Sequence, residues 1–171
     1  LIIWLGGLFA YYGIMMCAGS WGDLYTSSFI SSCIDIPGYL LIWWMYDHWG
    51  RRKPSFYCYF FAGVFATACI VLPEGMVRTG CAMMAKLLVG MICSAFFVYS
   101  GETFITSCRS TGIGYCSTGG RIGCILQAPF INMAPKQWLF PGFAIAFYAA
   151  ALGVVFLPET NKRPLPSNLE M

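Results

Sequence analysis

Charged side chains are scarce in this sequence, where Asp, Glu, Lys and Arg together make up 10% of 171 residues. Soluble domains carry about 25% charged residues, so the scarcity excludes an ordinary water-soluble domain. Apolar side chains instead account for 58% of the chain, and aromatic side chains for 18%. This balance is typical of a chain embedded in a lipid bilayer, and we expect an integral membrane protein.

Patterns that carry chemistry in enzymes are also missing. The single histidine, His48, lies in a basic loop far from any plausible Ser or Cys nucleophile, and Gly112 and Gly114 lack the dinucleotide-binding spacing. The nine cysteines show no C-x-x-C spacing and lie almost entirely in apolar runs, so we expect small apolar side chains, with a Cys69–Cys81 bridge left open. The sequence therefore predicts no enzymatic activity, no cofactor and no metal site.

Six apolar segments are long enough to cross a hydrocarbon core about 30 Å thick, which needs about 20 residues of helix. They lie at 1–19, 24–46, 55–72, 79–100, 113–133 and 138–157, and a tail follows at 158–171. The sequence therefore predicts an all-α polytopic bundle of six transmembrane helices. Because the chain begins without Met and inside an apolar run, we also expect a fragment of a longer protein.

The loop from Asp47 to Pro54 carries three of the ten basic residues and predicts the orientation of the chain. Basic loops between hydrophobic helices stay in the cytoplasm, so both ends of the fragment are expected there. Six basic residues then lie inside and two outside: Arg51, Arg52, Lys53, Arg109, Lys162 and Arg163 against Arg78 and Lys136. Since the basic residues are scattered among short loops, no nucleic-acid partner is expected.

Small residues crowd the fifth segment: Gly112, Gly114, Ser117, Gly119, Gly120 and Gly123. In lipid, such residues let two helix backbones approach closely. We therefore expect this helix to pack inside the bundle, against a partner that the pattern does not identify.

Four patterns, in this order along the chain, carry a resemblance to a known family. They are Asp47-x-x-Gly50-Arg51-Arg52; Glu102 followed after six residues by Arg109; Arg109-Ser-Thr-Gly112-Ile-Gly114 running to Arg121-Ile-Gly123; and Leu157-Pro158-Glu159-Thr160 followed by Pro164-Leu165-Pro166. The chain resembles the C-terminal six-helix half of a major facilitator superfamily transporter, and within it the organic cation, anion and zwitterion (carnitine) transporters. It departs from that family at Ile105, where Pro is usual, and in the basic stretch from Asn161 to Arg163.

The resemblance implies a secondary transporter of small organic ions that works by alternating access, in the plasma membrane. Its partners would be the substrate, the lipid bilayer and a missing N-terminal half. A sugar porter of the same superfamily is an alternative, but its first C-terminal helix would carry glutamines that 1–19 lacks. An organic cation transporter and a non-transporting receptor or scaffold also stay open.

Three ionisable residues lie inside predicted spans, where burial costs at least a few kcal/mol: Asp35, Lys86 and Arg121. Asp35 and Lys86 are expected either to neutralise each other or to form an ion pair that changes during transport. Arg121 is expected either to face the substrate or to pair with a carboxylate of the missing half. The resemblance implies a basic residue at this position in anion and zwitterion carriers, and a guanidinium binds carboxylate bidentately. The expected substrate is therefore an organic anion or a carnitine-like zwitterion.

Three aromatic residues of the first segment are further candidates for substrate binding: Trp4, Tyr11 and Tyr12. The spacing of seven puts Trp4 and Tyr11 on one helix face. These rings either pack and anchor the helix at the membrane surface or form a cage for an organic ring or a quaternary ammonium. The resemblance favours Tyr11.

A second group of residues lies at the predicted cytoplasmic side: Asp47, Gly50, Arg51, Arg52, Glu102, Arg109 and Glu159. Solvated loop charges need no role beyond orienting the chain. In the family, however, these motifs resemble a cytoplasmic gate that cross-links helices. Salt bridges that break and reform let two arrangements differ by about a few kcal/mol, as alternating access requires.

Overall fold

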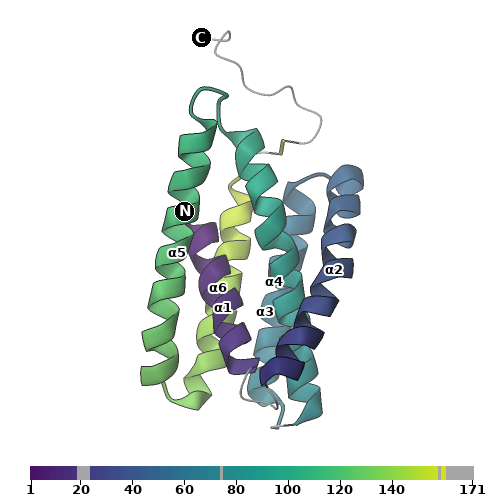
Figure 1. Ribbon diagram of the computed structural model, residues 1–171, viewed down its shortest axis with the longest axis vertical. Helices are drawn as coiled ribbons and strands as arrows, with labels where there is room; N and C mark the ends of the chain where they lie inside the picture. Colours follow the sequence, from purple (N-terminus) through teal and green to yellow (C-terminus); the bar gives the residue numbers. More distant parts are fainter. Residues whose placement is uncertain (19–23, 74, 158, 161–171) are drawn as a thin grey trace.

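The computed structural model describes residues 1–18, 24–73, 75–157 and 159–160, and within these ranges it contains helices and no strand. The six helices are α1 (Ile2–Ala18), α2 (Leu24–Trp49), α3 (Arg52–Val71), α4 (Met76–Thr103), α5 (Arg109–Met133) and α6 (Lys136–Val155). They lie side by side along one long axis (Figure 1). The predicted all-α bundle of six helices is confirmed.

Three helical stretches are long and apolar enough to cross a membrane: Arg52–Val71, Met76–Thr103 and Trp138–Val155. The apolar stretch Ile2–Cys17 is shorter. Membrane crossing by α1, α2 and α5 therefore stays a prediction. So do the membrane boundaries of all six segments, because helical hydrogen bonding continues past the apolar part of a helix.

Two groups of helices share the core. The first is α3 packed between α4 and α6, and the second is α1 packed against α5, α6 and α4. Tyr59, Tyr99, Phe143 and Phe147 fill the space between them with almost no exposed surface. The remaining helix, α2, packs mainly on α4, and this contact decides which of its side chains meet the rest of the bundle.

Glycines of α5 bring its backbone against α1. A Cβ on Gly123 would lie 2.5 Å from the carbonyl oxygen of Leu5, and one on Gly120 would lie 3.3 Å from that of Trp4. The predicted close packing is thus found, with α1 as the partner. It holds for one face of α5 only, because Ile125 on another face is 71% exposed.

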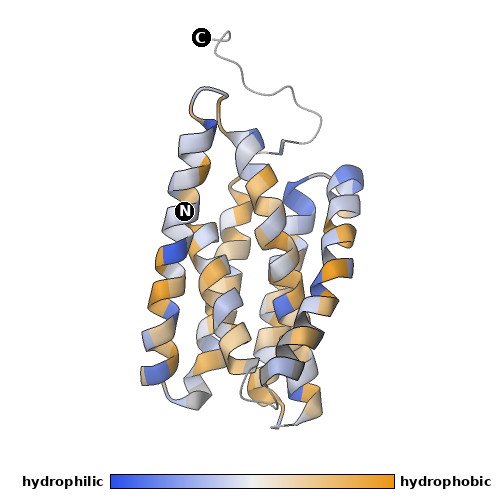
Figure 2. Cartoon of the chain, in the orientation of Figure 1, coloured by the Kyte–Doolittle hydropathy of each residue, from blue (hydrophilic) through white to orange (hydrophobic). Residues whose placement is uncertain are grey.

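Apolar residues run along the middle of the helices, and polar residues gather where α2 ends and α3 begins (Figure 2). Several large apolar side chains are exposed in the middle of helices, for example Leu40 and Trp43 at 71% each and Ile145 at 69%. Apolar surface of this extent is covered by lipid or by another protein segment.

Candidate functional site

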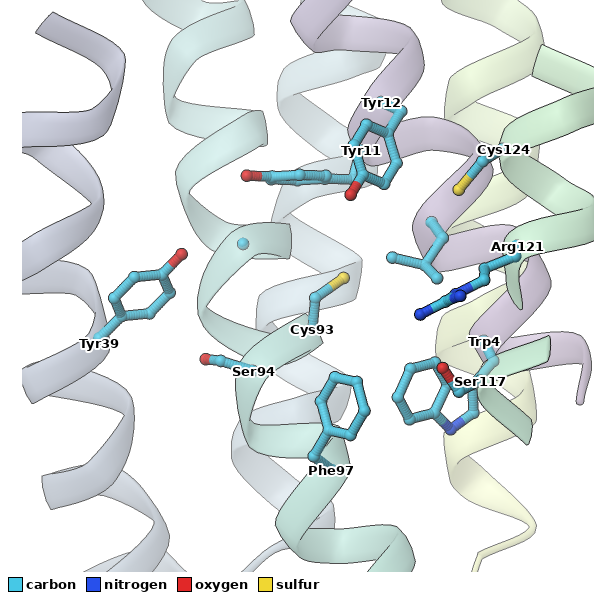
Figure 3. Close-up of a pocket in the computed structure, with 12 residues that line it drawn as sticks. Trp4, Tyr11, Tyr12, Tyr39, Cys93, Ser94, Phe97, Ser117, Arg121 and Cys124 are labelled. Carbon is cyan, nitrogen blue, oxygen red and sulfur yellow. The ribbon is translucent and has the colours of Figure 1, made fainter. Parts of the chain in front are cut away.

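A cavity of about 280 Å³ opens between α1, α2, α4 and α5 (Figure 3). Its lining consists of Trp4, Leu8, Tyr11, Tyr12, Tyr39, Gly90, Cys93, Ser94, Phe97, Ser117, Arg121 and Cys124. Arg121 is the charged residue of this lining, and no acidic residue belongs to it. Among the residues that the structure describes, the cavity is therefore a positively charged site with aromatic walls.

Arg121 extends from α5 toward Cys93 and Trp4, with its guanidinium inside the cavity (Figure 3). Ser117 lies one helical turn before it and lines the same cavity. Arg121 is an exposed residue that lines the cavity and is not closed off in the core. Its role as a substrate-facing cation stays a prediction.

The three aromatic residues predicted from the first segment all line the cavity. Trp4 is held in place, because its Nε1 donates a hydrogen bond to Ser100 Oγ at 3.2 Å and its ring meets Phe97 edge-on at 4.7 Å. The rings of Tyr11 and Tyr12 also meet edge-on, with centroids 5.2 Å apart.

Two further aromatic residues of the lining, Tyr39 and Phe97, were not predicted from the sequence. The signal for Tyr39 was its position one helical turn after Asp35, which puts both residues on one face of α2. No comparable signal marks Phe97. It belongs to the site because α4 faces α1 at that level, where Phe97 contacts Trp4.

Asp35 and Lys86 form a largely buried ion pair between α2 and α4. The Lys86 Nζ donates to Asp35 Oδ2 at 2.6 Å, and the two side chains are 4% and 12% exposed, respectively. Lys86 Nζ also lies 5.7 Å from the centroid of the Tyr11 ring. The pair itself does not line the cavity, but Tyr11 both lines the cavity and contacts Lys86.

Gly90 makes this arrangement possible. A Cβ at Gly90 would lie 3.3 Å from Tyr11 Cε2 and 3.8 Å from Asp35 Oδ1. Because no side chain stands there, α1 and α2 both approach α4 at the same level. The cavity, Tyr11 and the ion pair therefore form one continuous group of contacts.

Most of the predicted gate residues meet at the end of the bundle where α2 ends and α3 begins. Arg51 donates from Nη2 to Glu102 Oε1 at 3.0 Å and from Nε to Oε2 at 3.2 Å, a bidentate contact with α4. Thr160 donates to the same carboxylate at 2.8 Å, and Asp47 lies 3.7 Å from Arg51. One carboxylate thus joins the α2–α3 turn, the end of α4 and the chain after α6.

Glu159 caps the turn from the other side. Its carboxylate accepts the backbone N–H of Arg51 at 2.8 Å and that of Arg52 at 3.3 Å. Gly50 has φ +89°, and a Cβ there would lie 3.0 Å from Glu159 Oε1. Only glycine adopts this backbone freely and leaves room for the carboxylate.

Arg109 and Arg52 make other contacts. The Arg109 guanidinium, at the start of α5, donates to Thr106 Oγ1 at 3.5 Å in the preceding turn. Arg52 Nη2 donates to the carbonyl oxygen of Val155 at the end of α6. Gly19, Glu74, Pro158, Lys162 and Arg163 lie outside the described residues, and so does the predicted tail beyond 160.

Comparisons with known proteins bear on this arrangement. Solute carrier family 22 member 6 of Oryctolagus cuniculus is 30% identical over 177 residues, which cover 99% of this chain and 32% of the relative. The organic cation transporter protein of Drosophila melanogaster is 31% identical over 174 residues, 98% of this chain and 31% of the relative. The chain is a homologue of solute carrier family 22 transporters.

A third relative is the organic cation/carnitine transporter 2 of Rattus norvegicus, 26% identical over 175 residues, 99% of this chain and 31% of the relative. No protein-family model matches the chain. The resemblance to organic ion transporters is confirmed, and these relatives are transporters and not enzymes. The chain spans about one third of the length of these solute carrier family 22 relatives.

Proposed function

We propose that the protein to which this chain belongs is a secondary transporter of small organic anions or carnitine-like zwitterions. The observation that supports the proposal most directly is Arg121, the charged residue in the lining of a cavity that has no described acidic residue. A guanidinium pairs with a carboxylate through two parallel hydrogen bonds and repels a cation.

A zwitterion also suits the other wall of the cavity. Tyr11, Tyr12 and Tyr39 line the side of α1 and α2, and aromatic rings attract a quaternary ammonium by cation–π contact. A carnitine-like substrate would place its carboxylate at Arg121 and its ammonium against these rings. In this pose the substrate contacts both Arg121 and the aromatic wall of the cavity.

We further propose that the chain is the C-terminal half of the transporter and that the substrate lies between it and the missing N-terminal half. Rocking of the halves would expose the site alternately to each side. The Arg51–Glu102 contact and Glu159 would hold the gate end in one arrangement and release in the other. This end would face the cytoplasm at the plasma membrane.

An organic cation is the second candidate substrate. The aromatic lining suits a cation, and the Drosophila melanogaster relative is named an organic cation transporter. In that case Arg121 would pair with a carboxylate of the missing half and would not meet the substrate.

Uptake by the full-length protein tests the proposal. We expect saturable uptake of labelled carnitine or urate, and a loss of about tenfold or more in Arg121→Gln, because a charge-assisted hydrogen bond contributes about 1.5–3 kcal/mol. Arg121→Lys keeps the charge but loses the planar fork, so it should recover only part of the uptake. Surface labelling measures the amount of each variant at the membrane.

Two substrates provide the controls. Uptake of tetraethylammonium without uptake of carnitine or urate would favour the cation alternative. Uptake of labelled glucose alone would favour a sugar porter and contradict the proposal.

A further inference from the structure

A second cavity, of about 370 Å³, lies between the first turn of α3 and the end of α6. Its lining consists of Arg52, Lys53, Phe56, Tyr57, Val155 and Glu159. None of these residues lines the Arg121 cavity. The second cavity is therefore a separate feature at the gate end of the bundle.

The cavity has a surplus of positive charge. Lys53 is exposed, and the Arg52 guanidinium is held at the wall by its hydrogen bond to the carbonyl oxygen of Val155. The one carboxylate of the lining, that of Glu159, already accepts the backbone N–H groups of Arg51 and Arg52. Two cations against one hydrogen-bonded carboxylate favour an anionic ligand.

The surface next to the cavity is apolar. Tyr57, Phe61 and Val64 follow one another along α3 and are 49%, 50% and 40% exposed, respectively. Phe56, in the cavity wall, stacks on Phe60 with ring centroids 6.1 Å apart. Since α3 is long and apolar enough to cross a membrane, acyl chains would cover this face.

We propose that this cavity binds the headgroup phosphate of an anionic phospholipid, with an acyl chain lying along Tyr57, Phe61 and Val64. Two cations beside an exposed apolar surface match a phospholipid better than a free phosphate, because a free phosphate would make no contact with the apolar surface. Basic pockets between helices at the cytoplasmic surface recognise such headgroups. The proposal rests on the proposed orientation, since anionic lipids concentrate in the cytoplasmic leaflet.

Bound lipid would also bear on the gate. Glu159 lies in this cavity and holds the backbone of the turn that carries Arg51. A headgroup seated on Arg52 and Lys53 would keep the start of α3 against the end of α6. The lipid would thus stabilise the arrangement in which Arg51 meets Glu102.

Photolabelling of the full-length protein in lipid nanodiscs tests the proposal. The discs contain phosphatidylcholine alone or with phosphatidylserine, and the probes are both lipids with a diazirine in the acyl chain. We expect phosphatidylserine to label the peptide from Arg52 to Val71 more than phosphatidylcholine does. Lys53→Gln should weaken this labelling about fivefold, and Arg52→Gln with Lys53→Gln should reduce it to the phosphatidylcholine level.

Arg109→Gln is the matched control, because it removes a cation from the first turn of α5, outside the lining of the second cavity. Its labelling should equal that of the unchanged protein. Lys53→Arg keeps the charge and should also retain labelling, which separates charge from misfolding. Equal labelling by the two lipids, no loss in the double variant, or displacement by inorganic phosphate would each overturn the proposal.

The nanodisc result is independent of transport. Phosphatidylserine lies in both leaflets of a disc, so an inverted orientation would not abolish labelling. Labelling without carnitine or urate uptake would therefore contradict the proposed substrate and leave the lipid site standing. Uptake of carnitine or urate without selective labelling by phosphatidylserine would contradict the lipid site and leave the proposed substrate standing.

Discussion

The largely buried Asp35–Lys86 pair is a contact that a single substitution can unbalance. Its two charged groups lie 2.6 Å apart with little exposed surface, so each compensates the charge of the other. Removal of one partner from a buried pair costs about 3–5 kcal/mol, because the remaining charge stays buried and uncompensated. Since Tyr11 contacts Lys86 and lines the cavity, the pair is also placed to respond to substrate.

Neutralisation of one partner should therefore harm the protein more than neutralisation of both. We expect Asp35→Asn or Lys86→Gln alone to abolish most uptake by the full-length protein and to lower its thermal unfolding midpoint. The double variant should recover part of both quantities. Uptake and midpoint that are as low in the double variant as in each single variant would contradict the pairing as a functional unit.

At the scale of the helices, the contact between α5 and α1 depends on glycines of α5, which have no side chain to separate the two backbones. At Gly123, an added Cβ would press on the backbone of Leu5, which cannot rotate away as a side chain can. At Gly114, on the same helix, nothing lies within 4 Å of an added Cβ. The two glycines therefore share a helix but differ in what an added methyl group meets.

Gly123→Ala should destabilise the bundle by about 1–3 kcal/mol, the usual effect of overpacking. Gly114→Ala is the matched control and should leave stability unchanged or raise it by up to about 1 kcal/mol through helix propensity. Thermal unfolding of the purified full-length protein compares the two. Equal midpoints would show that α1 and α5 are not in close contact there.

For the chain as a whole, the ends of the bundle differ in chemistry. The gate residues gather at the end where α2 and α4 finish, whereas Met76 begins α4 at the opposite end and is 93% exposed (Figure 1). The basic loop predicts that the gate end lies in the cytoplasm. The two ends should therefore differ in access from outside the cell.

Cysteine labelling measures this access. In a background with the exposed residues Cys33 and Cys108 replaced by Ser, an impermeant maleimide should label Met76→Cys in intact cells. Lys53→Cys should react only after the membrane is permeabilised. The opposite pattern would invert the proposed orientation, and labelling of both sites in intact cells would contradict spanning between them.

Much of the fold was predictable from local patterns. Long apolar runs become helices in lipid, because a backbone without water must satisfy its hydrogen bonds within the segment. The Asp35–Lys86 pair was also predictable, since an isolated charge in a span needs a partner. Whether the pair changes during transport stays a prediction. The contact between Arg51 and Glu102 was harder to predict, because three acidic residues lie at the predicted cytoplasmic side and their spacing does not show which of them Arg51 meets.

Other features depend on how the helices rotate and cross. Spacing in the sequence placed Trp4 and Tyr11 on one face, but it did not place Phe97 opposite them or α1 against the glycines of α5. Which helix faces meet depends on how the ridges and grooves of both helix surfaces fit together. The spacing of residues along one segment does not show this fit.

Composition and the length of the apolar runs were thus sufficient to predict the helices and the loops that carry the charged residues, because both depend on each segment's interaction with lipid and water. The orientation in the membrane stays a prediction. The cavity around Arg121, the Glu159 cap on the Gly50 turn and the basic cavity beside α6 arise from contacts between distant segments. Such contacts exist only after packing fixes the neighbours of each side chain.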